Sequence, residues 1–149
     1  MTSLLIIAHA PLATSLRSVA QHTYPDCASV LHALDVASTE SPEDVEASLR
    51  TMLACAGGAE TLILADVFGA TPCNVALRVA DGNRARVVAG VNVPMLWRVL
   101  CYANEPLESL VTRAVSGGSQ GVMQVAVSRP QNQSVKSGND DQVQHQHQQ

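Results

Sequence analysis

Residues 61–74 read TLILADVFGATPCN, and this stretch decides the fold. Its first five residues, apolar after the opening threonine, predict a strand at 61–65 that is buried on both faces, as in a parallel sheet. The apolar run stops at Asp66. A short loop follows, and we expect a helix with Thr71 as its cap and Pro72 as its first residue. The stretch therefore predicts a strand–loop–helix unit with an acidic side chain at the tip of the strand.

The same alternation of strand and helix continues on both sides of this unit. Strands are predicted at 4–8, 30–36, 61–65 and 86–89, and helices at 12–22, 42–56, 72–79, 92–102 and 106–117. This alternation predicts an α/β fold with a doubly wound, mostly parallel four-stranded sheet and helices on both of its faces. The short apolar segment 121–127 has no helix after it, so we expect a C-terminal edge strand, paired within the chain or exchanged in a dimer.

Composition separates one folded domain from a polar tail. The chain has 149 residues, 46% of them apolar, which is enough for one domain with its own core, expected at 1–127. Residues 128–149 are rich in Gln, Asn, Ser and His, so we expect a disordered tail there. The net charge of −4 argues against nucleic acid as a partner, because phosphate-backbone binding needs clustered Lys and Arg.

The sequence also bears on the cellular location of the protein, on metal and cofactor sites, and on the state of its cysteines. No apolar run is long enough to span a bilayer, and no basic region precedes the first one, so we expect a cytoplasmic protein. Neither a metal-binding cluster nor a nucleotide-binding glycine motif occurs, so no metal and no cofactor is expected. The cysteines are widely spaced, and we expect them to be buried free thiols: Cys27, Cys55, Cys73 and Cys101.

Two ionisable side chains stand where apolar strands end, His9 after the first strand and Asp66 after the third. Ligands of open α/β sheets bind beyond the carboxyl ends of the strands, and neighbouring strands lie about 5 Å apart, so the two side chains can meet. A carboxylate that holds one imidazole nitrogen leaves the lone pair of the other nitrogen free as a nucleophile. Placement alone leaves a structural role open for both residues, and it leaves Asp35 as another partner for the histidine.

Backbone N–H groups at helix starts are natural ligands for phosphate oxygens. Beside the two strand tips, such groups are expected at Ala10, Ala70 and Thr71, and the Thr71 hydroxyl would add a further donor. A phosphoryl group on the histidine would therefore find hydrogen-bond donors in the same loops.

The order of these motifs resembles the mannose-class enzyme IIA family of the bacterial sugar phosphotransferase system. The resemblance covers about residues 3–127 and is carried by Leu4–His9, LADVFGATPCN within Leu62–Asn74, VAGVNVPML at Val88–Leu96 and AVSGG at 114–118. It implies that His9 is the phosphorylated residue and Asp66 its partner. It also implies that the phosphocarrier protein HPr donates the phosphoryl group, that a IIB domain accepts it, and that the chain forms a homodimer by exchanging its last strand. The membrane would be reached only indirectly, through a permease.

One stretch within this resemblance departs from the family pattern, and another has two interpretations. The family has Gly after the active histidine, whereas this chain has Ala10 and then Pro11, which restrict the loop, so phosphoryl transfer is expected to survive at a lower rate. In the VNVPML stretch, Val91, Val93 and Met95 either pack against the sheet or form an apolar surface on which a partner protein docks.

The sequence leaves several functions open. A IIA protein can feed a sugar permease, or it can act in regulation by reporting its phosphorylation state to a target protein, and both use the same histidine chemistry. The phosphotransfer subunit of a dihydroxyacetone kinase resembles the same fold and is an alternative. A non-catalytic binding module is another, and it predicts that His9 has no role in phosphorylation.

Overall fold

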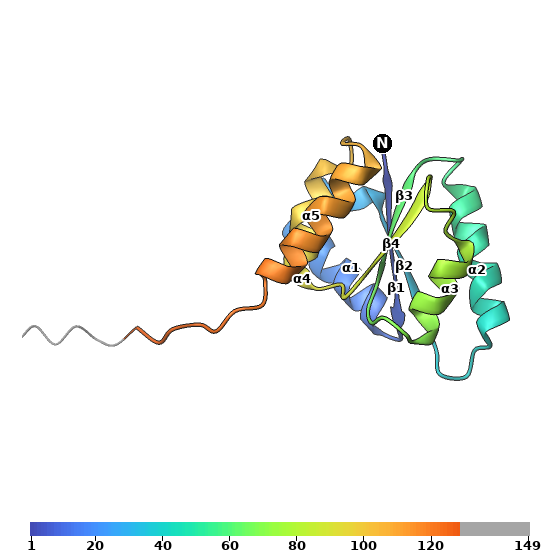
Figure 1. The fold of residues 1–149 in the computed structure, drawn as a ribbon, viewed down its shortest axis with the longest axis horizontal. Coiled ribbons are helices and arrows are strands. Elements are labelled where there is room, and N and C mark those ends of the chain that lie inside the picture. Colours follow the sequence, from blue (N-terminus) through green and yellow to red (C-terminus); the bar gives the residue numbers. More distant parts are fainter. Residues whose placement is uncertain (129–149) are drawn as a thin grey trace, which may run out of the picture.

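The computed structural model describes residues 1–128, so the expected tail lies outside the described residues from position 129 onward. Within this part of the chain, four strands and five α-helices alternate, together with two short 3-10 helices (Figure 1). In chain order they are β1 (Ser3–His9), α1 (Leu12–Thr23), η1 (Ala28–Val30), β2 (Leu31–Val36), α2 (Pro42–Cys55), β3 (Thr61–Ala65), α3 (Thr71–Val79), β4 (Ala85–Ala89), α4 (Val93–Val99), η2 (Leu100–Tyr102) and α5 (Leu107–Gln120).

The sheet has the strand order β2-β1-β3-β4, and every pair in it is parallel. The chain leaves β1 toward β2 on one side and then builds β3 and β4 on the other, so the winding reverses between β1 and β3. The expected doubly wound α/β fold is confirmed, and the four strands are all parallel rather than mostly parallel. The point of reversal is where sheets of this kind bind ligands.

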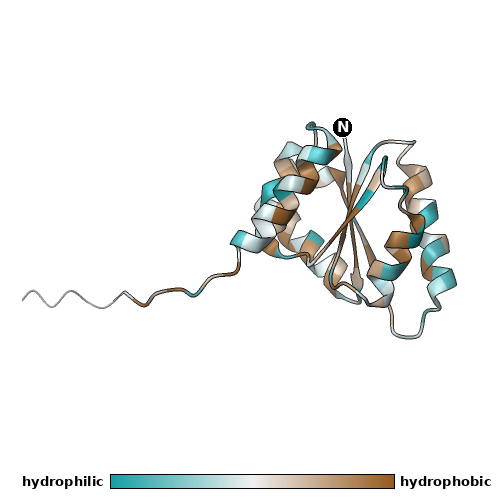
Figure 2. Cartoon of the chain, viewed as in Figure 1, coloured by the Kyte–Doolittle hydropathy of each residue, from teal (hydrophilic) through white to brown (hydrophobic). Residues whose placement is uncertain are grey.

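Helices cover both faces of the sheet, as expected. Figure 1 shows α1, α4 and α5 on one side and α2 and α3 on the other. Along β1 the buried side chains alternate, so Leu4 and Ile6 join the apolar cluster beneath the first group and Leu5 and Ile7 join the cluster beneath the second. The strands between the two helical layers are coloured as hydrophobic along most of their length in Figure 2. Two aliphatic cores, one on each face, therefore fix the positions of the strand tips.

Every helix starts within one residue of the position predicted from the sequence. The Ser41 hydroxyl accepts a hydrogen bond from the Asp44 N–H at 3.1 Å, so the expected cap of α2 is confirmed. At α3 the expected cap is wrong by one position, because Ala70 is the N-cap residue and Thr71 is the first helical residue. The Asn92 side chain caps α4 by accepting from the Met95 N–H at 2.9 Å.

Helices α4 and α5 pack closely because two glycines of α5 face α4. A Cβ atom on Gly118 would lie 2.8 Å from Cε of Met95, and one on Gly117 would overlap the side chain of Arg98. The Nδ2 group of Asn92 also donates to the Gly118 carbonyl at 3.1 Å, so the residue that caps α4 also ties it to α5. The loop after β4 is thereby held by the helices that follow it.

The expected C-terminal strand is not formed. Helix α5 continues to Gln120, and residues 122–128 have no strand pairing. Figure 1 shows this segment leading away from the sheet, and it does not pair with the edge strand β4 of the same chain. Its apolar side chains are exposed instead, with exposed fractions of 80% for Val122, 80% for Val125 and 90% for Val127.

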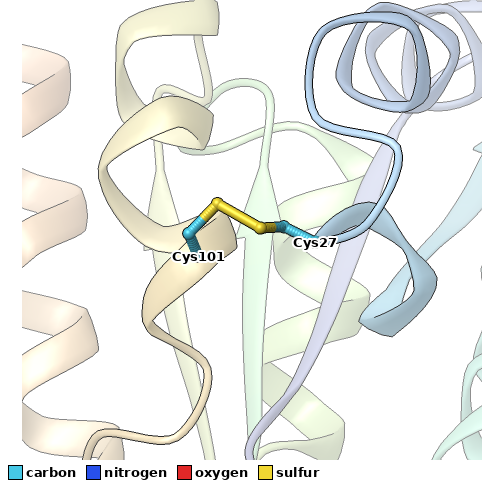
Figure 3. Close-up of a disulfide and its surroundings, with 2 residues drawn as sticks. All are labelled: Cys27 and Cys101. Atoms are coloured by element: carbon cyan, nitrogen blue, oxygen red, sulfur yellow. A yellow bond between two sulfur atoms is a disulfide. The ribbon is translucent and has the colours of Figure 1, made fainter.

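The expectation that all four cysteines are buried thiols is wrong for three of them. Cys27 and Cys101 form a disulfide with their Cα atoms 5.2 Å apart (Figure 3). Cys55 is free and exposed, and Cys73 alone is free and buried. A pair separated by 74 positions has no signature in the sequence, because only the fold brings η1 and η2 together.

Candidate functional site

The fold brings His9 and Asp66 together at the point where the winding of the sheet reverses. His9 is the last residue of β1, Asp66 directly follows β3, and these two strands are hydrogen-bonded neighbours. The ring nitrogen Nδ1 of His9 lies 2.6 Å from Oδ2 of Asp66. The two strand tips named by the sequence therefore form one site.

Three hydrogen bonds fix the carboxylate of Asp66. Oδ2 accepts from the backbone N–H of His9 at 2.9 Å as well as contacting the ring, and Oδ1 accepts from the Val67 N–H at 2.8 Å. With a proton on Nδ1, the ring donates this hydrogen bond to Oδ2 of Asp66, and the lone pair of Nε2 is then available for chemistry. The imidazole is open to a partner, because 55% of the His9 side chain is exposed, whereas only 10% of the Asp66 side chain is.

The same contacts set the ionisation of Asp66. Burial acts to raise the pKa of this carboxyl, but the hydrogen bonds from His9 and Val67 and the charge of the ring outweigh it, so the pKa of Asp66 lies below its ordinary value. Asp66 is therefore ionised at neutral pH. An anion at this position stabilises an imidazole ring that gains positive charge when it is modified.

The N-terminal end of α1 has few donors to offer a ligand. The Ala10 N–H, which we expected to bind phosphate, donates to the Val36 carbonyl at 2.9 Å. Pro11 has no N–H. The Thr14 N–H and hydroxyl both donate to Asp35, at 3.1 Å and 2.6 Å. The side chain of Asp35 thus hydrogen-bonds to α1, while the histidine contacts Asp66.

The N-terminal end of α3 is different. The backbone N–H groups of Ala70 and Thr71, and the Thr71 hydroxyl, make no hydrogen bond within the described part of the chain. The loop before this helix turns at Gly69, where φ is +89° and a side chain would be strained. The Asn74 side chain donates to the Gly69 carbonyl at 3.4 Å. Two of the three expected phosphate-binding residues therefore keep their donors free, beside the strand that carries Asp66.

The apolar residues of the VNVPML stretch pack against the core, which is one of the two alternatives expected for them. Met95 is only 3% exposed and belongs to the core, so its side chain is not open to a docking partner, while Val91 and Val93 are half-buried and pack against the same cluster. Two apolar side chains that no sequence pattern singled out, Val67 and Phe68, directly follow Asp66 and are 49% and 77% exposed. The signal available was the position of an aromatic side chain in a loop between an apolar strand and a helix.

Two further findings concern metal and membrane. Among residues 1–128, no three His, Cys, Asp or Glu side chains lie together in a way that could hold a metal ion. In the same part of the chain, none of the helices is both long and apolar enough to cross a bilayer.

Comparison with known proteins gives a consistent result. The family model described as PTS system fructose IIA component, where PTS denotes the phosphotransferase system, matches residues 3–115. The PTS system mannose-specific EIIAB components of Escherichia coli (strain K12) and Shigella flexneri are 41% identical over 64 residues. That alignment spans 41% of this chain and 20% of either relative, so the match covers about a fifth of the curated relatives.

Solved structures extend the similarity to most of the chain. The mannose/sorbose specific IIA subunit from Enterococcus faecalis superposes with a TM-score of 0.80 at 25% identity, covering 87% of this chain and 98% of that one. The phosphotransferase system component EIIA from Streptococcus agalactiae gives a TM-score of 0.76 at 21% identity, covering 83% of this chain and 97% of that one, and supports the fold.

The lowered pKa of Asp66 predicts how its contribution to stability depends on pH. Because the folded-state pKa lies below the ordinary value of 3.8, the contribution is present above that value and is lost as the pH falls through the folded-state pKa. Asp66→Asn should lower the free energy of unfolding by about 1–2 kcal/mol near pH 7, and by less below about pH 4. Urea unfolding at both pH values measures this difference. Asp26→Asn, in an exposed turn, is the control, and a pH-independent effect of Asp66→Asn would contradict the assignment.

Proposed function

The chain belongs to the PTS fructose IIA component family, and from this premise we propose that it is a phosphocarrier that accepts a phosphoryl group on Nε2 of His9. The observation that carries the proposal is the 2.6 Å contact between Nδ1 of His9 and Oδ2 of Asp66, which orients an exposed ring. The protein is then a phosphotransferase component with a phosphohistidine intermediate. No metal or cofactor is assigned to this step, in which the ring itself is the nucleophile.

The proposed step is an in-line transfer between two histidines. The Nε2 lone pair of His9 attacks the phosphorus of phosphorylated HPr, and the bond between phosphorus and the donor imidazole breaks, with its electron pair returning to that ring. The His9 ring now carries a P–N bond on Nε2 and a proton on Nδ1, so it is cationic. The ionised carboxylate of Asp66 stabilises that charge at hydrogen-bond distance.

The oxygens of the transferred group are proposed to bind at the start of α3. The N–H groups of Ala70 and Thr71 and the Thr71 hydroxyl are the donors assigned to them, since a helix N-terminus favours an anion. Ala10 is not assigned to this set of donors, because its N–H already donates to the Val36 carbonyl.

The acceptor is proposed to be a IIB domain, or a regulatory target that responds to the phosphorylation state. Relatives of this chain are described as mannose-specific EIIAB components and as a mannose/sorbose specific IIA subunit, which favours the sugar phosphotransferase system over a dihydroxyacetone kinase. In either role the protein acts in the cytoplasm and reaches the membrane only through its partners.

The central test is phosphorylation of the chain itself. Incubation with enzyme I, HPr and labelled phosphoenolpyruvate should place acid-labile, base-stable label on the parent. His9→Ala should remove the label, and Asp66→Asn should slow labelling by about 10²-fold to 10³-fold, the size expected when a group that stabilises developing charge is lost. His32→Ala, an exposed histidine on β2, is the matched control. Label that survives in His9→Ala would overturn the proposal.

Partner docking is proposed to use an apolar rim around the site formed by Val67, Phe68, Val91 and Val93. The Val91 N–H donates to the carbonyl of Ala65, the last residue of β3, at 3.0 Å, so the loops after β3 and β4 lie side by side. Phe68 is the most exposed aromatic side chain of the described residues, at 77%. An exposed aromatic beside a reactive group is typical of a residue that anchors a protein partner.

Phe68→Ala should raise the KM for phosphorylated HPr by about tenfold and leave kcat within about twofold, because the side chain binds the partner without touching the reacting atoms. Steady-state phosphorylation at varied HPr concentration measures both constants. Leu77→Ala removes a side chain of 50% exposure on α3 away from the rim and should change neither. An unchanged KM in Phe68→Ala would exclude the rim as the docking surface.

A homodimer is proposed in which residues 122–127 of each chain pair with the sheet of the other. Within one chain β4 is bonded only to β3, so its outer edge is open. The segment has apolar side chains that are 70–90% exposed at Val122, Met123, Val125 and Val127. An open strand edge and an unpaired apolar segment are two surfaces that the formation of a β-ladder would cover.

Sedimentation of two truncated chains tests this dimer. A chain ending at Ser128 should remain dimeric at micromolar concentration, whereas a chain ending at Gly121 should be monomeric, because only the second lacks the exchanged segment. Equal sedimentation of the two chains would show that residues 122–127 do not hold a dimer together.

A further inference from the structure

The disulfide between Cys27 and Cys101 joins two helices at the end of the sheet remote from His9. Cys27 lies in the turn after α1 and Cys101 lies in η2 directly after α4 (Figure 3). Both helices begin at the carboxyl ends of strands, beside the candidate site, and both lie over the same face of the sheet. The disulfide therefore links the far ends of α1 and α4 and closes a loop between positions 74 apart.

Both cysteines are at least partly accessible from the surface of the molecule. Cys101 is exposed and Cys27 is half-buried. Both line a surface cavity of about 170 Å³, with Asp26, Ser29 and Asn104 among its polar residues. A small thiol in this cavity would approach the disulfide without any rearrangement of the core.

The pair lies at the margin of the core. Cys27 packs against the edge of the apolar cluster beneath α1, α4 and α5, Cys101 belongs to neither cluster, and the four strands pair through their own backbone. The other two cysteines are not positioned to replace the pair, since Cys55 ends α2 and Cys73 is buried in α3, both on the opposite face of the sheet. Breaking the disulfide would therefore leave a folded chain with two thiols held near one another.

From this geometry we propose that Cys27 and Cys101 form a thiol–disulfide exchange site for small thiols and disulfides of the glutathione class. This goes beyond the proposed phosphotransfer and does not depend on it. An accessible disulfide that the core does not require is of the reversible kind, whereas structural disulfides are enclosed and resist reduction.

The oxidation runs in two exchange steps. The thiolate of Cys101, the more exposed residue, attacks one sulfur of glutathione disulfide, and the first glutathione leaves as its thiolate. The thiolate of Cys27 then attacks the Cys101 sulfur of the mixed disulfide, and the second glutathione leaves. Two protein thiols are oxidised, one glutathione disulfide is reduced to two glutathiones, and the two protons released by the cysteines are taken up by the leaving thiolates.

The experiment equilibrates the full chain in buffers of graded glutathione to glutathione disulfide ratio, quenches with acid, alkylates the free thiols and identifies them by mass spectrometry. We expect one transition, in which Cys27 and Cys101 lose their alkylation together while Cys55 and Cys73 do not pair. Cys27→Ser should trap one glutathione on Cys101, and Cys101→Ser should take up glutathione on Cys27 several-fold more slowly. The oxidised chain should melt roughly 5–15 °C above the reduced one, because the crosslink restricts the unfolded state.

Cys55→Ser is the matched control, since it removes the other exposed thiol and should leave the transition unchanged. Four alkylated thiols at every ratio would overturn the proposal, because the pair would then not form from glutathione disulfide. A disulfide that persists in excess reduced glutathione would also overturn it, because the bond would then be closed to exchange. Loss of the transition in Cys55→Ser would assign the exchange to a different cysteine.

Discussion

Parallel pairing of β1 with β3 is the constraint on which the rest of the structure depends. Its register places Ile7 beside Ala65, so β3 ends two residues before β1 does, and Asp66 follows Ala65 within reach of His9, the last residue of β1. Aliphatic cores on both faces hold the two strands rigidly, which is what an imidazole and a carboxylate need in order to meet at 2.6 Å. The chemistry proposed for the chain is thus a consequence of strand packing.

Much of this arrangement could be predicted from the sequence, because it follows from local patterns. The bounds of β3 were predicted without error, since the apolar run stops sharply at Asp66, and Ser41 was recognised as the cap of α2. The meeting of the two strand tips required one assumption beyond local pattern, that β1 and β3 are neighbours, and the strand order confirms it.

The remaining features depend on contacts that no local pattern encodes. Residues 121–127 have the apolar character of a strand, but within one chain they pair with neither edge of the sheet. The N–H of Ala10 is not the free donor that its position in the sequence predicts, because the end of β2 brings the Val36 carbonyl to it. The pairing of Cys27 with Cys101 likewise arises only when two distant turns come together, because spacing along the chain gives no sign of it.

The contacts of Asp35 with Thr14 have a consequence for the electrostatics around the imidazole. A carboxylate at the start of α1 compensates the positive end of that helix dipole, whereas the start of α3 has no acidic residue in its first turn. The donors left free beside the histidine therefore lie on the α3 side. In the proposed transfer the oxygens of the phosphoryl group would be held from that side, so the same helix end would also favour one angle of approach to the ring.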